Sequence, residues 1–231
     1  MEKWFRKFWQ LCSRLSERGG VSLWRLMRPL PSGRKCKCLH FKSFDTLTRI
    51  RDINAAAPNC ECEGSRLSRF SPGPITGGET LVRFAFHPIH FNPKKGTLKP
   101  SLFSHAELRG CSIQRDQSAT DDELTKFVRD YLALDATRVW KGVVAASADA
   151  LRRITLEGDG DRAICAYDSG EDGNPAHGEF GWSRTFLEPG DANELRSLIW
   201  NAFGAGTPVL PSQYRSGSVF RALSADLRGR A

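Results

Sequence analysis

Apolar and polar residues alternate along residues 80–91, and this period of two predicts a β-strand. Val82, Phe84 and Phe86 share one side of the strand, and the other side holds Leu81, Arg83, Ala85 and His87. Pro88 ends or bends the strand because proline has no N–H to donate. Short runs rich in strand formers predict further strands at residues 111–115, 139–146 and 161–168.

Helix signals separate these strands. Thr120 and Glu123 match a capping box, and an apolar stripe at helical spacing follows them. Ser147 is a typical N-cap for a brief helix, and residues 189–194 open another helix that ends at Gly204. Strands in two groups with helices between them favour an α+β fold, with a mixed or antiparallel sheet and two or three helices.

The first third of the chain has a different texture. Residues 3–16 predict an amphipathic helix with a Trp/Phe face and a basic face, and residues 43–57 predict a short helix. The first of these helices suits a membrane interface, a partner groove, a phosphate backbone or docking on the main domain. Pro and Gly cluster after residue 70. The expected organisation is therefore an arm at 1–70, a linker at 71–79, a domain at 80–204 and a tail at 205–231.

Composition is ordinary for a globular protein, with 40% hydrophobic residues, but the charge is unevenly spread. Residues 1–70 hold 15 Lys and Arg against 6 Asp and Glu, whereas the rest of the chain holds 19 against 20. This asymmetry predicts a contact with a polyanion, the alternative being a solvated basic arm. The basic residues expected to make such a contact are Arg6, Lys7, Arg14, Arg34, Lys35 and Lys37.

The redox state of the seven cysteines depends on the cellular compartment of the protein. No stretch reaches the roughly 20 apolar residues of a membrane span. The first residues also lack the continuous apolar core of a secretory signal, so a cytoplasmic location and reduced thiols are expected. Two Cys-x-Cys pairs then form a candidate structural zinc site of Cys36, Cys38, Cys60 and Cys62. One intervening residue is fewer than zinc sites usually have, so unliganded thiols are the alternative.

Histidines and an arginine gather around the first strand. Arg83 and His87 lie on the same predicted strand face, and His177 lies in a Gly-rich segment that is expected to be a polar loop. Together they indicate an anion-binding or acid–base pocket, the alternative being unrelated surface residues. The carboxylates near His177 also offer oxygen ligands for a hard cation, but a solvated loop is the favoured interpretation.

Four short motifs follow one another in order: Arg83-x-x-x-His87-Pro88, Pro100-Ser101-x-Phe103, Cys111-Ser112-Ile113 and Asn174-Pro175-Ala176-His177. In this order they resemble a widespread group of small uncharacterised bacterial proteins. The resemblance covers residues 80–180 and implies no established activity. It implies that the first candidates for a functional pocket are Arg83, His87, Ser101 and His177.

Two functions are consistent with these features. In the first, the protein is a binding module of a bacterial assembly, such as a defence or mobile-element system, and its basic arm contacts nucleic acid or a protein partner. In the second, residues 80–204 form a small enzyme whose Arg, His and Ser loosely resemble the layout of ADP-ribosyltransferase-like folds, with Glu179 as the nearest catalytic carboxylate. The enzyme requires its candidate residues to converge in one pocket.

Overall fold

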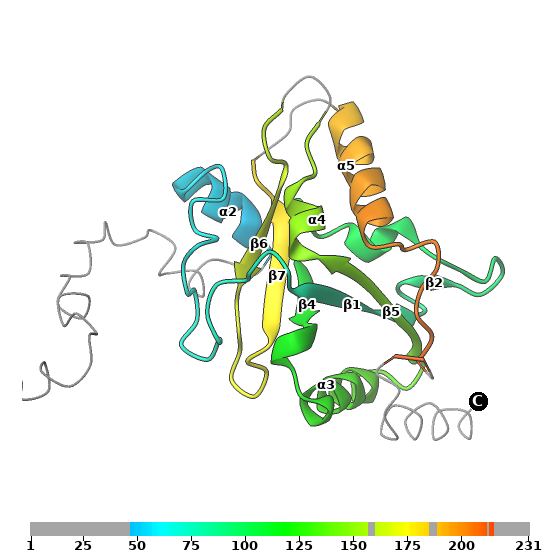
Figure 1. Cartoon of the computed structure of the whole chain (residues 1–231). Helices are drawn as coiled ribbons and strands as arrows, with labels where there is room; N and C mark the ends of the chain where they lie inside the picture. The colour runs from blue at the N-terminus through cyan, green and yellow to red at the C-terminus, as the bar shows by residue number, and fades with distance from the viewer. Residues whose placement is uncertain (1–46, 157–159, 185–188, 212, 215–231) are drawn as a thin grey trace, which may run out of the picture. The chain divides into compact units, whose positions relative to one another are not determined.

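An antiparallel five-stranded sheet lies at the centre of the described part of the chain (Figure 1). The computed structural model describes residues 47–156, 160–184, 189–211 and 213–214. The strands are β1 (Thr80–His87), β4 (Cys111–Arg115), β5 (Val139–Ser147), β6 (Ile164–Asp168) and β7 (His177–Trp182), in the order β5-β1-β4-β7-β6. A separate hairpin consists of β2 (Phe91–Asn92) and β3 (Thr97–Leu98). The α+β class expected from the sequence is confirmed.

Apolar side chains cover both faces of the sheet, as the alternation in β1 predicts. Leu81 and Ala85 belong to a cluster with α4 (Ala148–Arg152) and α5 (Pro189–Ala202), and the 3-10 helix η3 (Pro100–Phe103) joins it. On the other face, Val82, Phe84 and Phe86 pack with α3 (Asp121–Ala133). The sheet is therefore buried on two sides, and Figure 1 shows α3 and α5 at opposite ends of it.

The predicted helix caps form. Thr120 Oγ1 accepts a hydrogen bond from Glu123 N, and the Glu123 carboxylate accepts one from Thr120 N, so the capping box at the start of α3 is complete. Ser147 Oγ accepts from Ala150 N at the start of α4. A second 3-10 turn, η4 (Asp116–Ser118), joins β4 to α3. Local sequence thus positions the helix that borders the site described below.

The sequence predicts a polar loop over residues 169–182, and this prediction is wrong for residues 177–182. Residues 177–182 form β7, a buried strand between β4 and β6. Because glycine is a poor strand former, Gly178 and Gly181 lower the strand propensity of this segment, and the sequence pattern does not predict the strand. Gly181 is required for packing, since a Cβ there would lie 2.7 Å from Ile50 Cγ1 on α2 (Arg49–Ala56).

The expected boundary at residues 71–79 is also wrong, because residues 47–79 pack as part of the domain. Ile50 and Ile53 of α2 are fully buried. Arg115 on β4 donates to the carbonyl oxygens of Gly73 and Pro74, inside the supposed linker. At the other end, Val143 and Val209 pair their backbones, so the expected tail also begins within the domain.

A disulfide joins Cys60 to Cys165 on β6. Cys62 is disulfide-bonded as well, and Cys111 is a free buried thiol. A sulfur in a disulfide is no thiolate ligand, so these bonds contradict the zinc site and the expectation of reduced cysteines. The expected cytoplasmic location stays a prediction, although disulfides are typical of oxidising compartments.

Several expectations lie outside the described residues: the helix at 3–16, Cys36, Cys38 and the contact residues Arg6, Lys7, Arg14, Arg34, Lys35 and Lys37. None of the helices in the described ranges has the length and apolar character needed to cross a bilayer.

Candidate functional site

The sheet opens between β1 and β4. β1 pairs with β5 along its whole length, from Thr80 to His87, but it pairs with β4 only at Leu81 and Val82. Beyond this point the Arg83 side chain links the two strands, because its Nη1 donates to Ser112 O at 2.6 Å. The guanidinium group therefore occupies the place where the backbone ladder stops.

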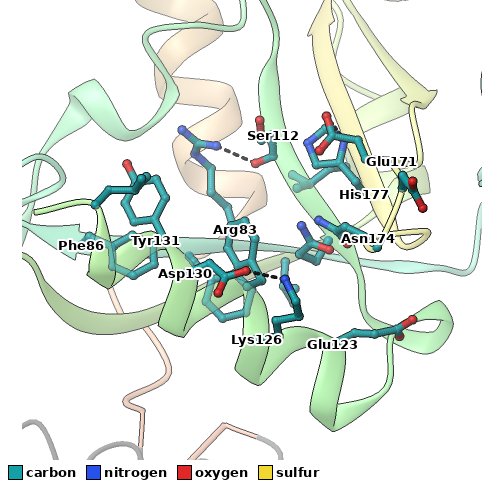
Figure 2. A pocket seen from close by; sticks show the side chains of 18 of the residues that line it. Arg83, Phe86, Ser112, Glu123, Lys126, Asp130, Tyr131, Glu171, Asn174 and His177 are labelled. Carbon is teal, nitrogen blue, oxygen red and sulfur yellow. Dashed lines mark hydrogen bonds and ion pairs between the residues drawn. The ribbon is translucent and has the colours of Figure 1, made fainter.

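Two adjoining cavities meet at this opening, on the face that carries α3. The larger has a volume of about 520 Å³ and extends along α3, while the smaller is about 260 Å³ and extends toward Arg49 of α2. The residues that line both cavities are Arg83, Ser112, Glu171 and His177. Figure 2 shows Arg83 between Phe86 and Tyr131 on one side and Asn174 and His177 on the other.

Arg83 is a buried cation held by neutral groups. Its exposed fraction is only 7%, and Nε donates to Leu102 O at 2.6 Å. Among the described residues no carboxylate forms an ion pair with it, and Nη2 has no hydrogen-bond acceptor. Burying a charge without a counter-charge costs several kcal/mol. Two carbonyl oxygens orient this guanidinium, but they leave its positive charge uncompensated.

Cross-strand pairs place four polar side chains on the same face of β4 and β7. Ser112 pairs with Glu179, and Gln114 pairs with His177. Glu179 Oε1 accepts from Arg49 Nη1 at 2.8 Å, whereas the buried Oε2 has no partner among the described residues. Burial raises the pKa of Glu179 above 4.5, against the lowering effect of the charges of His177 and Arg49. The smaller cavity thus holds a carboxyl group that takes up a proton more readily than an exposed one.

His177 lines both cavities, and its two ring nitrogens differ in their contacts. Its Nδ1 lies 2.9 Å from Ser169 Oγ and 3.3 Å from Ser169 O, and no described residue bonds Nε2. Depending on the tautomer, Nε2 either donates a hydrogen bond to a ligand or accepts a proton from one. The neighbouring Ser112 hydroxyl is exposed and bonds no described side chain.

His90 stays neutral at the edge of the larger cavity. Burial, followed by the positive charge of Arg83, lowers the pKa of His90 to about 3. Its Nδ1 accepts a hydrogen bond from Phe86 N at 3.3 Å. His90 therefore adds a polar wall without adding positive charge.

The structure brings together some of the residues expected from the sequence and separates others. Arg83 and His177 line both cavities, and Glu179 lines the smaller one. His87 and Ser101 line neither; Ser101 is exposed on η3 and faces Ile89 O at 3.5 Å. The pocket of four residues expected from the motif order is therefore not formed as a unit.

Sequence reasoning missed Ser112 and Gln114 as site residues. A usable signal was present, because these two polar residues alternate with Cys111 and Ile113 in a short strand. That period of two puts both on one face, opposite the apolar core. The signal is brief, and its meaning depends on β7 lying alongside.

A metal site finds no support in this region. The described residues contain no group of three or more His, Cys, Asp or Glu side chains arranged to hold a metal ion. Asp168, which was considered as an oxygen ligand, is buried and lies 3.4 Å from Arg115 Nη1. Glu171 and Asp172 are exposed in the turn before β7, in agreement with the solvated loop favoured from the sequence.

Comparison with known protein families, with curated proteins and with solved structures finds no match to this chain. The resemblance based on the four ordered motifs stays a prediction, and the function must be argued from the site.

Proposed function

We propose that the domain binds a small anionic ligand at Arg83, in the two adjoining cavities between α2 and α3. The observation that carries this proposal is the buried guanidinium, which is oriented by Leu102 O and Ser112 O and lacks a carboxylate partner among the described residues. A phosphate or carboxylate beside Nη2 would supply the missing negative charge through charge-assisted hydrogen bonds.

The surroundings favour the same class of ligand. Arg49 and Arg109 also line the smaller cavity, and among the described residues only Arg49 has a carboxylate partner there, Glu179. The smaller cavity is therefore bordered by three arginines and two glutamates, one of which has a raised pKa. The larger cavity lies within the range of small-molecule sites, about 300–1,000 Å³.

The test measures stabilisation of the full chain by inorganic phosphate, acetate and citrate at constant ionic strength. A ligand at 100 times its Kd stabilises the folded protein by about 2.7 kcal/mol. The variant Arg83→Gln should lose this stabilisation, and Arg83→Lys, which keeps the charge but not the fork, should retain part of it. Arg153→Gln is the matched control, because Arg153 is exposed and lines neither cavity. Equal stabilisation of Arg83→Gln and the unsubstituted protein by every anion would refute the proposal.

A catalytic use of the same site is the second candidate. It is supported by two proton-exchanging groups at the smaller cavity, Glu179 with its unpartnered Oε2 and His177 with its open Nε2, beside the Ser112 hydroxyl. The likeness to ADP-ribosyltransferase-like folds is not carried further, since Ser101 lies outside both cavities. If a bound ligand is converted, mass spectrometry should find product with the native chain and not with Glu179→Gln. Conversion at an equal rate by that variant would remove Glu179 from the chemistry.

We also propose that the basic first segment contacts nucleic acid or an acidic protein partner, as the charge asymmetry indicates. Replacing Arg34, Lys35 and Lys37 by Glu in the full chain should weaken binding to nucleic acid and reduce its dependence on salt. The matched control replaces Lys94 and Lys95, which are exposed on the β2–β3 hairpin. An unchanged salt slope in the triple variant would count against a polyanion contact through these residues.

A further inference from the structure

Gln114 is a buried amide without a partner. Its exposed fraction is 2%, and neither Nε2 nor Oε1 makes a hydrogen bond within the described part of the chain. An unpaired buried amide costs about 1–3 kcal/mol, and such groups are rare in folded proteins. Gln114 lines the larger cavity, so its side chain borders a space that a ligand can enter.

Its neighbours place the amide beside the anion site. Gln114 pairs with Val82 of β1 on one side and with His177 of β7 on the other. Arg83 follows Val82 directly and reaches Ser112 O, two residues before Gln114. The guanidinium and the amide therefore belong to adjacent strands at the point where the sheet opens.

Aromatic rings form one part of this wall, and charged side chains form another: Glu123, Lys126, Asp130, Glu171 and Asp172. Phe84 and Phe127 line the larger cavity with their rings in edge-to-face contact at a centroid distance of 5.3 Å. Phe86 and Tyr131 lie beside them with centroids 4.4 Å apart. Such a wall favours a flat ring, which buries apolar area and can contact aromatic edges. A planar amide complements a partner that presents a hydrogen-bond donor next to an acceptor, the pattern found along the edge of a nucleobase.

We propose that the ligand of the larger cavity is a flat heterocycle joined to an anionic group, as in a nucleoside monophosphate or a heterocyclic carboxylic acid. Gln114 bonds the donor–acceptor edge of the ring, and Arg83 bonds the anion. This inference rests on the proposed anion site and adds the identity of the group attached to the anion.

The test compares the affinities of the full chain for adenosine 5′-monophosphate, orotate, adenosine and inorganic phosphate by calorimetry. Adenosine 5′-monophosphate or orotate should bind at least about tenfold more tightly than inorganic phosphate or adenosine, because only the first two join a ring edge to an anion. Tighter binding of adenosine 5′-monophosphate would identify the anion as phosphate, and tighter binding of orotate would identify it as carboxylate.

Substitution of Gln114 separates the ring from the anion. Gln114→Met keeps the size of the side chain but removes donor and acceptor, and it should lower the affinity for the preferred ring compound about tenfold while leaving phosphate binding unchanged. Gln117→Met is the matched control, since Gln117 is exposed and lines neither cavity. The unliganded Gln114→Met protein should be at least as stable as the native chain, because an unpaired buried amide is removed; a native-like circular dichroism spectrum confirms that it folds.

The outcomes distinguish this inference from the proposed function. If phosphate binds in an Arg83-dependent way but the ring compounds bind no better, or if Gln114→Met binds them like the native chain, the heterocycle is excluded and the anion site stands. If no probe binds more tightly to the native chain than to Arg83→Gln, the anion site fails, and the inference fails with it.

Discussion

The Cys60–Cys165 disulfide should make a large contribution to the stability of the domain. It connects positions separated by 105 residues, and replacing both cysteines by Ser opens this loop with little change in side-chain size. The chain-entropy estimate for a loop of this length is about 4.7 kcal/mol at 25 °C. Because both sulfurs lie at buried positions, the new hydroxyl groups add a further cost of about 1 kcal/mol or more. A loss of about 5 kcal/mol is a large fraction of the 5–15 kcal/mol typical of a folded domain.

The assay is urea unfolding of the full chain, followed by tryptophan fluorescence under non-reducing conditions. Alkylation after denaturation without a reductant, followed by mass spectrometry, reports whether the thiols of Cys60 and Cys165 are free. Cys111→Ser is the control, because Cys111 is a free, fully buried thiol whose replacement measures the cost of a buried hydroxyl alone. The reasoning is refuted if the double variant loses no more stability than this control, or if the alkylating reagent labels Cys60 and Cys165 in the denatured, unreduced chain.

Three further predictions concern packing and pH. Gly181→Ala should destabilise the domain by about 1–3 kcal/mol, because its Cβ would lie 2.7 Å from Ile50 Cγ1. In urea unfolding this substitution should cost less when residue 50 is already changed by Ile50→Ala, and an equal cost in both backgrounds would place the strain elsewhere. Burial by itself raises the pKa of Glu79, but the hydrogen bonds from Arg115 and Thr76, together with the charge of Arg115, outweigh this effect and keep the pKa below 4.5. The stability from this pair is therefore present above pH 4.5 and lost as the pH falls through the folded-state pKa, so Glu79→Gln should cost about 3 kcal/mol at pH 7 and much less at pH 2; equal losses at both pH values would contradict the assignment. Burial lowers the pKa of His90 from 6.5 to about 3, so its contribution to stability is present above pH 6.5 and lost as the pH falls toward 3. His90→Asn should make the free energy of unfolding depend less on pH between 6.5 and 3. An unchanged pH dependence in this window would exclude His90 as its cause.

Arg83 and Gln114, the two polar residues on which the proposals rest, differ in how well the sequence indicates their roles. Arg83 stands out in the sequence because a charged residue in an apolar strand needs a reason. Gln114 does not stand out, since an amide in a short strand is ordinary until its burial is known. Its lack of a partner is a property of β1, β4 and β7 together, and these strands come from distant parts of the chain.

The sequence by itself determined the local elements: the alternation of β1, the capping box at Thr120, the N-cap at Ser147 and the end of α5 before Gly204. Each of these depends on residues a few positions apart, which single-sequence patterns capture. Only the tertiary structure decided that residues 47–79 belong to the domain, that a Gly-containing segment is the strand β7, and that Cys60 meets Cys165. These features depend on contacts between residues far apart in the sequence, 42 positions for Gly73 and Arg115 and 105 for Cys60 and Cys165. At such separations, packing against Ile50 or a covalent bond outweighs local propensity. The charge of Arg83 is of the same kind, because its lack of a counter-charge among the described residues depends on which segments pack around it.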